Sequence, residues 1–414
     1  MAQRQKIRPK VLVMTSTYPR WKNDHEPGFV HELSKRLIAD FDVTVLCPHA
    51  PDSAAFEDLE CVKVHRFRYA PAIFETLVND GGIVTNLKKF RWKWILLPFF
   101  FAGLCWSTFR MIRRFQPHVI HAHWLIPQGI VLLFLKCIGV RVPPYLITCH
   151  GADLFALQSR PLTWLKRQVA QNAEAITVVS YAMKGELVTL GVPRERITVQ
   201  SMGVDLVCRF APDGEVRTDN KHQVLFVGRM VEKKGARYLI EAVPAIIQVF
   251  PKTVVRMVGF GPEFVMLKEL AVKLGVNDSI DFTGPKSQEE VANFGRKSNV
   301  FVAPFVEAEG GDQEGLGLVL VEALGVGCAV VVTDIPAAKD VTQVAPDAVC
   351  VVKQRSSEEI AAAVVRVLKA PDAYRQGALM SRQRLIEKFD WASVANAYSN
   401  ILSTIVPCSF SQSD

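Results

Sequence analysis

The chain has 414 residues, of which 49% are hydrophobic and 22% charged, with a formal net charge of +8 and a pI near 9.0. This length favours two domains of ordinary size, and the composition excludes a disordered chain. The basic balance suits an anionic partner such as phosphates, nucleic acid or an acidic membrane surface, although a merely soluble basic protein has the same charge.

The nine cysteines are an odd number and form no C-x-x-C pair. We therefore expect reduced thiols in a cytoplasmic protein, without a disulfide framework or a zinc site. The first ten residues, MAQRQKIRPK, are basic but lead directly into an apolar run, so no signal peptide is expected.

Apolar strand-like runs alternate with helical patterns through the first half of the chain. Strands are predicted at 10–17, 42–48, 62–68, 119–124, 145–151, 175–180 and 196–205, and helices at 30–39, 86–115, 128–138, 162–173 and 181–190. Residues 206–222 contain Pro212, Asp213 and Gly214 and little apolar content, which indicates a linker.

The pattern then restarts. Strands are predicted at 223–229, 253–259, 280–284, 299–305 and 351–356, and helices at 235–249, 262–274, 287–296, 357–369, 371–387 and 391–404. Such alternation predicts an α/β fold with two doubly wound, Rossmann-like domains, at 1–205 and 223–388. Active sites in these sheets lie at the carboxyl ends of strands, and we expect one in the cleft between the domains.

The stretch 301–335 reads as strand, glycine-rich acidic loop, helix and strand. Gly315 and Gly317 lie where the helix begins, and an uncapped helix N-terminus suits a phosphate. Glu314 and Glu322 stand beside this position with seven residues between them. Carboxylates do not bind phosphate, so their partners are hydroxyl donors such as those of a sugar or ribose. The combination points to a nucleotide-sugar.

Three strand-to-helix turns supply the counterparts. VGRMVEKKG places Arg229 at a strand end and Lys234 before a helix, and two cations with a helix N-terminus neutralise a diphosphate. VGFGP contains Gly259, and TGP contains Gly284; backbone groups at these turns could read a base, although neither pattern is specific.

The first domain offers histidines at its strand ends. TCHGADLF places His150 beside Asp153, which could orient it. HVIHAHW puts His121 and His123 on one strand face, where packing and cleft lining are favoured over zinc because no further ligand has suitable spacing.

Residues 88–115 contain three tryptophans and an apolar core from Trp94 to Trp106, with Lys and Arg on both sides and no acidic residue. The core is short for a bilayer span and contains Pro98. The pattern fits a helix lying in the interface of an anionic membrane, with a buried helix as the alternative. Because the basic residues are mixed with Trp and Phe, nucleic-acid binding is not expected.

No P-loop, G-x-G-x-x-G after the first strand or G-x-S-x-G occurs. Together the motifs resemble family 4 of the retaining GT-B glycosyltransferases over nearly the whole chain. The resemblance rests on PGFV (27–30), TCHGAD (148–153), MGVD (202–205), GRMVEKKG (228–235), VGFGPE (258–263) and EGLGLVLVE (314–322), the last being the family's E-x7-E signature. Ser201-Met202-Gly203 departs from the Pro-Asn-Gly common in the family, and the loop EAEGGDQEG is unusually acidic.

The resemblance implies a donor-binding C-terminal domain, an acceptor-binding N-terminal domain, and a final segment, 389–414, that crosses back to the first domain. Glu322 would accept ribose hydroxyls and Glu314 those of the donor sugar. Arg229 and Lys234 would bind the diphosphate, with Gly317 and Leu318 offering amides nearby. His150 would line the sugar pocket and Gly28 would face donor and acceptor. No metal or other cofactor is expected.

These features predict transfer of a hexose from a nucleoside-diphosphate sugar to a hydroxyl of a lipid-linked or polysaccharide acceptor, with retained configuration. No side chain is an obvious nucleophile, which fits a front-face mechanism. We expect a cytoplasmic enzyme of cell-envelope glycan synthesis, peripheral on the inner face of the membrane. An epimerase or a glycan phosphorylase on the same fold, and a two-lobed ligand-binding protein, are the alternatives.

Overall fold

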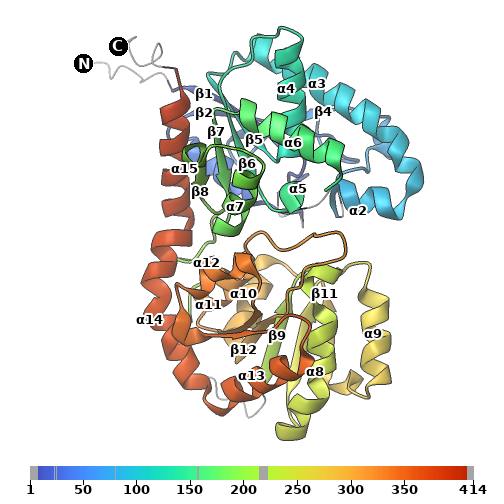
Figure 1. Ribbon diagram of the computed structural model, residues 1–414, viewed down its shortest axis with the longest axis vertical. Helices are drawn as coiled ribbons and strands as arrows, with labels where there is room; N and C mark the ends of the chain where they lie inside the picture. The colour runs from blue at the N-terminus through green and yellow to red at the C-terminus, as the bar shows by residue number, and fades with distance from the viewer. Residues whose placement is uncertain are drawn as a thin grey trace. The chain divides into compact units, whose positions relative to one another are not determined.

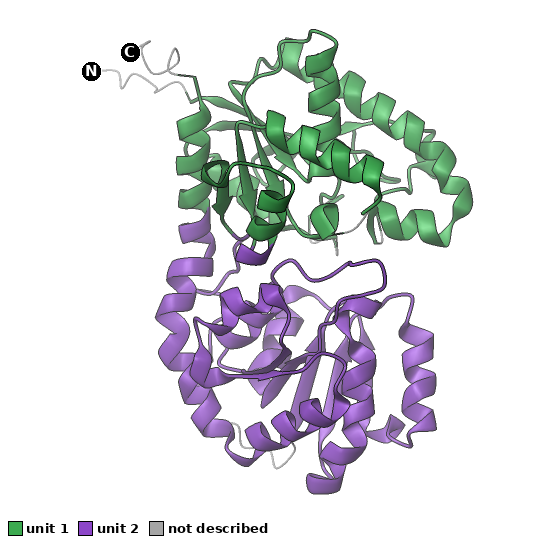
Figure 2. Ribbon diagram, viewed as in Figure 1, with its two compact units in different colours: residues 1–179, 183–200, 395–414 green, residues 180–182, 201–394 purple. Residues whose placement is uncertain are grey.

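The computed structural model describes residues 8–22, 24, 26–79, 81–155, 158–213 and 222–407. The chain forms two compact units (Figures 1 and 2). Unit 1 comprises Met1–Val179, Met183–Gln200 and Ala395–Asp414, and unit 2 comprises Ser180–Ala182 and Ser201–Val394. Each unit has its own parallel sheet covered by helices, so the predicted α/β class is confirmed.

Unit 1 is built on an eight-stranded sheet in the order β3-β4-β2-β1-β5-β6-β7-β8. The strands are β1 (Lys10–Met14), β2 (Asp42–Pro48), β3 (Phe56–Leu59), β4 (Val62–Phe67), β5 (Val119–His123), β6 (Tyr145–Cys149), β7 (Ala175–Val178) and β8 (Ile197–Val199). All pairs are parallel except β3 with β4. Strand β3 is not predicted from the sequence because FEDL has neither an apolar run nor a clear alternation.

Helices lie on both faces of this sheet. They are α1 (Phe29–Leu37), η1 (Ala72–Phe74), α2 (Gly82–Lys89), η2 (Arg91–Ile95), α3 (Leu96–Arg114), η3 (Leu125–Gly129), α4 (Ile130–Cys137), α5 (Ala152–Phe155), α6 (Arg160–Asn172), α7 (Tyr181–Thr189) and η4 (Arg194–Arg196). The single helix predicted over 86–115 is wrong, because Phe90 is extended and separates α2 from η2. The buried Lys93 stabilises this bend by donating hydrogen bonds to the Thr76 carbonyl and the Asn86 side chain, both at 2.7 Å.

Unit 2 has a six-stranded, fully parallel sheet in the order β11-β10-β9-β12-β13-β14. Its strands are β9 (Gln223–Val227), β10 (Val254–Val258), β11 (Ile280–Gly284), β12 (Val300–Ala303), β13 (Ala329–Thr333) and β14 (Val349–Val352). Their continuous Val, Ile and Phe runs suit strands buried on both faces. Numbered within the unit, the order is that of a dinucleotide-binding sheet, whose direction reverses between β9 and β12.

The helices of unit 2 cover both faces of this sheet. They are η5 (Glu232–Lys234), α8 (Ala236–Val249), α9 (Phe264–Lys273), η6 (Asn277–Ser279), α10 (Gln288–Lys297), α11 (Leu318–Gly325), η7 (Pro336–Ala338), α12 (Lys339–Thr342), η8 (Pro346–Ala348), α13 (Ser357–Lys369) and α14 (Pro371–Phe389). The last helix, α15 (Trp391–Ile405), begins in unit 2 and belongs to unit 1 from Ala395 onward. The strand predicted at 351–356 begins two residues earlier and ends four residues earlier, as β14 at Val349–Val352, and Ser356 caps α13 instead of extending the strand.

The chain between the sheets differs from the predicted extended strand and linker. Strand β8 ends at Val199, and Val204 pairs instead with Asp390, beside the start of α15. Leu206 and Phe210 are buried in unit 2, within the stretch predicted as a linker. Residues 214–221 of that stretch lie outside the described residues.

Candidate active site

The predicted phosphate-binding residues of unit 2 lie where the strand order of its sheet reverses. Ligands of doubly wound sheets bind beyond the carboxyl ends of the strands at this point. Arg229 follows β9, and Lys234 ends η5. Gly235 then turns the chain into α8 with φ +63°, and a Cβ there would lie 1.7 Å from the carbonyl oxygen of Pro304. Only glycine therefore lets the Lys234 turn approach the end of β12.

Lys234 and Glu314 form an ion pair in this site. The Lys234 Nζ lies 2.7 Å from Oε2 of Glu314 and 4.8 Å from the centre of the Phe305 ring. Burial alone would raise the pKa of Glu314, but the charges of Lys234 and Lys233 outweigh it and lower that pKa. Glu314 is thus ionised at neutral pH and able to accept hydrogen bonds from hydroxyl groups.

Glu322 lies on α11 and differs from Glu314 in its ionisation. Burial raises the pKa of Glu322 to about 7, against the opposing charges of Lys234 and Arg209. Because the charge of Lys234 acts on both carboxyls, the three groups belong to one site. A pair of carboxyls with divergent pKa values beside a cation is typical of a functional site.

The start of α11 lies in the same site. Gly317 is the N-cap with φ +80°, and a Cβ there would lie 2.9 Å from Cε2 of Phe305. Leu318 is the first helical residue, and no side chain caps the helix. The first amide groups of a helix have no intrahelical acceptor, so this end can bind an anion.

Gly259 and Gly284 lie at the ends of β10 and β11. A Cβ on Gly259 would lie 2.0 Å from the carbonyl oxygen of Gly228, and the Gly259 amide donates to the Gly284 carbonyl at 2.9 Å. Close packing of backbones explains why glycine is needed at position 259. Contact of either residue with a donor stays a prediction.

In unit 1, His150 follows β6 and pairs with His123 at the end of β5. The Nε2 of His150 lies 2.9 Å from Nδ1 of His123, and the two rings stack with centres 5.2 Å apart. Burial, with a smaller contribution from His121, lowers the pKa of His150 to about 3. His150 therefore presents a neutral imidazole at physiological pH.

Asp153 acts on His150 through the backbone rather than through the ring. Its carboxylate accepts the amide hydrogens of Leu125, His150 and Gly151 at 3.0, 3.1 and 3.2 Å. The expectation that Asp153 orients the imidazole is therefore corrected, since the partner of the ring is His123. Asp153 fixes the turn that carries His150.

Gly28 is the N-cap of α1, in the loop that follows β1. The next residue, Phe29, places its ring 4.9 Å from the ring of His150, so the structure brings this loop to the His150 turn. Among the residues that the structure describes, a Cβ at Gly28 would come within 4 Å of Pro19 alone, at 3.9 Å.

His121 and His123 share one face of β5 and are fully buried. His121 Nε2 lies 2.7 Å from Oγ1 of Thr148, and the ring stacks on Tyr398 of α15 at 5.5 Å. The packing interpretation is confirmed. Among the described residues, no group of three or more His, Cys, Asp or Glu side chains is placed to hold a metal ion. The eight described cysteines are free thiols, and Cys408 lies outside the described residues.

Two residues beside the site are missed by motif reading. Trp124 has φ +77° and places its ring 4.8 Å from that of His150, an unusual backbone for a bulky residue. Lys233 pairs with Asp312 at 3.0 Å, next to the Lys234–Glu314 pair. The Lys233-Lys234 doublet and the acidic loop signal this second pair in the sequence, whereas nothing local reveals the backbone of Trp124.

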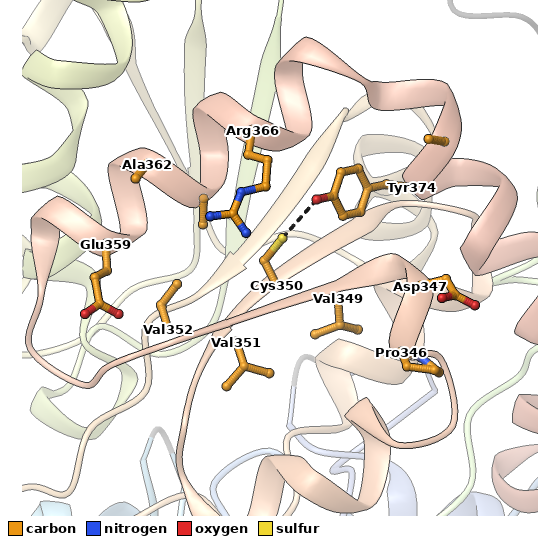
Figure 3. Close-up of a pocket in the computed structure, with 12 residues that line it drawn as sticks. Pro346, Asp347, Val349, Cys350, Val351, Val352, Glu359, Ala362, Arg366 and Tyr374 are labelled. Atoms are coloured by element: carbon orange, nitrogen blue, oxygen red, sulfur yellow. Dashed lines mark hydrogen bonds between the residues drawn. The ribbon is translucent and has the colours of Figure 1, made fainter.

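A cavity of about 770 Å³ lies elsewhere in unit 2, along the edge strand β14 (Figure 3). It is bounded by α13 and α14, and the Cys350 thiol donates a hydrogen bond to the Tyr374 hydroxyl across it at 3.4 Å. None of the predicted site residues lines this cavity.

Two family models match the chain in succession. The model described as Glycosyltransferase Family 4 matches residues 29–207, and the model described as Glycosyl transferases group 1 matches residues 210–387. Residues 29–387 thus match glycosyltransferase families almost without a break. The first match contains His150 and Asp153 of unit 1, and the second contains Arg229, Lys234, Glu314 and Glu322 of unit 2.

Curated relatives have related names. The glycosyltransferase is 30% identical over 220 residues to the putative colanic acid biosynthesis glycosyltransferase WcaL of Escherichia coli, a match that covers 53% of the chain and 54% of WcaL. The chain thus aligns with about half of the WcaL sequence. It is 26% identical to a GDP-mannose-dependent phosphatidylinositol monomannoside mannosyltransferase of Mycobacterium tuberculosis, over 95% of the chain and 98% of that protein.

Solved structures share the fold of this glycosyltransferase. Sucrose-phosphate synthase from Thermosynechococcus elongatus matches with a TM-score of 0.77 at 19% identity, over 96% of the chain and 99% of that structure. HepE of Anabaena, solved with UDP and glucose, matches with a TM-score of 0.72 at 17% identity, over 96% and 100%. At these identities the likeness concerns the fold, and it confirms the predicted GT-B architecture.

Proposed function

We propose that the protein transfers a hexose from a nucleoside-diphosphate sugar to a hydroxyl group of a lipid-linked or polysaccharide acceptor, with retention of the anomeric configuration. The observation that carries this proposal is the cluster of Lys234, Glu314 and Glu322 at the switch point of unit 2, with Arg229 on the adjoining turn. The cluster combines cations for a diphosphate with carboxylates for hydroxyl groups.

Donor binding follows from the charges. Arg229 and Lys234 neutralise the diphosphate, and the first amides of α11, at Gly317 and Leu318, add hydrogen bonds to it. Glu322 accepts the ribose hydroxyls and the ionised Glu314 accepts hydroxyls of the sugar. Glu314 lies 2.7 Å from the Lys234 ammonium group and holds it in position.

Transfer is proposed to occur on one face of the sugar. The acceptor oxygen bonds to the anomeric carbon as the bond to the phosphate oxygen breaks, and the acceptor proton passes to the departing diphosphate. Arg229 and Lys234 stabilise the charge that develops on that leaving group. The neutral His150 lines the sugar pocket, and Asp153 holds the turn that carries it.

We also propose that the reaction needs no metal ion, because two cationic side chains supply the charge that a divalent cation would supply. Dialysis against EDTA should leave turnover within about twofold of the untreated enzyme, and added Mg²⁺ or Mn²⁺ should not raise it. A loss on chelation that is restored by one of these ions would contradict this part of the proposal.

The donor is identified by a thermal-shift screen of UDP-, GDP- and ADP-sugars. A donor at about a hundred times its dissociation constant stabilises the folded state by roughly 2.7 kcal/mol, so the correct base should raise the melting temperature clearly. Absence of a shift with all three classes would contradict nucleotide-sugar binding. NMR of the product from the identified donor then reports the anomeric configuration.

The proposed acceptor class agrees with the names of two relatives, which concern colanic acid and a phosphatidylinositol mannoside. A place in cell-envelope glycan synthesis, on the cytoplasmic side of the membrane, is part of the proposal. Incubation with donor alone, with and without phosphate, separates transfer from the alternatives. Epimerisation or phosphorolysis at the rate of transfer would favour an epimerase or a phosphorylase.

A further inference from the structure

The basic excess of the chain lies in one stretch of unit 1. Residues 81–152 contain nine Lys and Arg residues and no Asp or Glu, whereas the whole chain has a net charge of +8. The stretch includes α2, η2, α3 and α4. The remainder of the chain is thus nearly neutral, and any anionic surface would meet unit 1 through these helices.

Helix α3 presents an apolar face to solvent. Phe99 is 58% and Trp106 is 60% exposed, and Ile95, just before the helix, is 68% exposed. Their spacing of four and seven residues places them on one side, while Phe100 and Leu104 are fully buried on the other. An ordinary surface helix carries polar residues on its outer face, so this exposed face requires a partner.

The apolar surface continues onto η2 and η1. Trp92 and Trp94 are 47% and 57% exposed, and Trp92 contacts Phe74 edge-on with ring centres 6.1 Å apart. Ile73 beside it is 74% exposed. We call the exposed side chains of Ile73, Phe74, Trp92, Trp94, Ile95, Phe99 and Trp106 the aromatic surface.

Exposed basic residues flank the aromatic surface at both ends. Lys88, Lys89 and Arg91 precede it, and Arg110 and Arg113 follow it along α3. Aromatic side chains beside Lys and Arg form the pattern that places a protein at the headgroup level of an anionic bilayer.

Buried polar contacts hold the aromatic surface to the carboxyl edge of the unit 1 sheet. Glu75, next to Phe74, is fully buried and accepts hydrogen bonds from Arg68 and from the Tyr69 amide, both at 2.9 Å. It also contacts His49, which follows β2. The same edge carries His150 after β6. A bilayer against the aromatic surface would therefore adjoin the edge assigned to the acceptor.

We infer that the aromatic surface docks on an anionic lipid bilayer, with its tryptophan and phenylalanine side chains at the headgroup level and the flanking Lys and Arg residues on lipid phosphates. The inference of docking depends only on the observations made on the aromatic surface. Its role, presenting a lipid-linked acceptor to the His150 edge, rests on the proposed function.

The segment lies on the membrane rather than across it. Arg91–Arg114 is the one helical segment among the described residues that is long and apolar enough to span a bilayer, and a third of its most apolar window is buried in the protein. Spanning would remove Phe100, Leu104 and Thr108, all fully buried, from the core of unit 1. A second copy of the chain is also disfavoured as the partner, because it would oppose like charges.

Flotation with vesicles tests the docking. Wild-type protein should float with phosphatidylcholine vesicles that contain phosphatidylglycerol and should remain behind with phosphatidylcholine alone. Each basic residue near an anionic surface contributes about fivefold to binding, so neutralising three should weaken it more than tenfold. The variant is Lys88→Gln/Lys89→Gln/Arg91→Gln, and its charge-matched control on exposed lysines of unit 2 is Lys252→Gln/Lys273→Gln/Lys297→Gln.

The apolar contribution is tested in the same assay. Trp94→Gln/Phe99→Gln/Trp106→Gln should lose flotation, whereas a control on exposed apolar residues of unit 2, Val265→Gln/Val272→Gln/Met380→Gln, should keep it. Absence of wild-type flotation, or equal binding by variants and controls, would overturn the inference. So would sedimentation of the wild type as a dimer that the aromatic variant converts to a monomer without any vesicle binding.

Brominated lipids locate the contact. Replacing Trp92, Trp94 and Trp106 by Phe should retain vesicle binding but remove most of the quenching of tryptophan fluorescence by brominated phosphatidylglycerol. Trp164→Phe, which alters an exposed tryptophan of α6, should leave the quenching unchanged. Unchanged quenching in the triple variant would place the contact elsewhere. Thermal shifts with nucleotide-sugars, measured without vesicles, should be unaffected, so that failure of docking and failure of the proposed function are distinguished.

Discussion

At the scale of single residues, Lys234 interacts with several other groups of the candidate site. Its ammonium group pairs with Glu314 at 2.7 Å and lies over Phe305. Its charge helps to lower the pKa of Glu314, and it opposes the burial that raises the pKa of Glu322. Under the proposed function, the diphosphate of the donor competes with Glu314 for this cation and leaves the carboxylate available for sugar hydroxyls. The proposed donor therefore engages both partners of the ion pair.

Removing either partner of this pair should abolish most of the activity. Lys234→Ala and Glu314→Gln are each expected to lower turnover by about a hundredfold to a thousandfold, because each removes a charged contact to the transition state. Steady-state transfer assays with the identified donor measure the effect. Lys233→Ala is the matched control, since it breaks the neighbouring pair with Asp312 and should cost less than about tenfold. Near-normal turnover in both site variants would refute the assignment.

Glu322 should make stability depend on pH. An unfolded glutamate has a pKa of about 4.3, and burial raises the pKa of Glu322 in the folded chain to about 7. The folded state therefore holds more protons in this window, and the stability from protonated Glu322 is lost as pH rises through about 7. As pH rises from about 5 to about 8, the melting temperature of Glu322→Gln should increase relative to that of the wild type. Glu314→Gln removes a carboxyl with a lowered pKa, so its melting temperature should not increase relative to that of the wild type over this pH range.

The same ionisation should control donor affinity. Ribose hydroxyls donate to the ionised carboxylate, so the affinity of the wild type for the identified nucleotide-sugar should fall as pH drops below about 7. Glu322→Gln should bind weakly with no such dependence, as isothermal titration calorimetry would measure. A nucleotide-sugar is the suitable probe, because its diphosphate diester does not titrate in this range. A wild-type affinity independent of pH would contradict the ribose role.

At the level of elements, the departure from Pro-Asn-Gly at Ser201-Met202-Gly203 has a packing context. Met202 is buried, and Gly203 lies against Trp391 at the start of α15, where a Cβ would come within 2.4 Å of the indole ring. The adjacent Val204 exchanges backbone hydrogen bonds with Phe389 and Trp391. This junction therefore fixes the start of α15 on unit 2.

Gly203→Ala should disturb this junction. The added methyl group forces the indole of Trp391 to shift, at a cost of about 1–3 kcal/mol in unfolding free energy. Gly185→Ala is the matched control, because Gly185 lies within α7 with open space around its Cβ, and alanine should be neutral or slightly stabilising there. Urea unfolding of both variants measures the difference. Equal stability of the two variants would contradict the packing account.

The sequence predicts the parallel strands and most helices well, because their apolar runs and caps are local signals. The bounds predicted for helix 357–369 match those of α13, whereas its cap, Ser356, is predicted to end the preceding strand. The bend at Phe90 and the antiparallel strand β3 are not predicted, since the first depends on the buried Lys93 and the second on pairing with β4. Both are set by tertiary contacts that no sequence window contains.

The candidate site follows the same rule. Arg229, Lys234, Glu314 and Glu322 are found from strand ends and from a glycine-rich turn. The pairing of His150 with His123 is not found, because it joins strands 27 residues apart in the chain. The depressed pKa of His150 depends on that burial and is equally invisible in the sequence.

At the scale of the whole molecule, the last helix belongs to both units. Trp391–Val394 group with unit 2, and residues from Ala395 group with unit 1. In unit 1 Tyr398 is fully buried, stacks on His121, and donates a hydrogen bond to the Gln200 carbonyl at 3.2 Å. Helix α15 thus completes the core of unit 1, although most of that unit comes from the first 200 residues of the chain.

Tyr398→Ala should therefore destabilise unit 1 selectively. Loss of a fully buried aromatic side chain costs about 3–5 kcal/mol, and the cavity would lie against His121 under the His123–His150 pair. Hydrogen exchange should accelerate in β5 and β6, whereas β12 and β13 keep their protection. Tyr398→Phe should cost only about 1 kcal/mol, because it removes the hydroxyl and keeps the ring, and Ser399→Ala on the exposed side of α15 should change little. Equal loss of protection in both sheets would mean that α15 stabilises the chain as one cooperative body rather than completing unit 1.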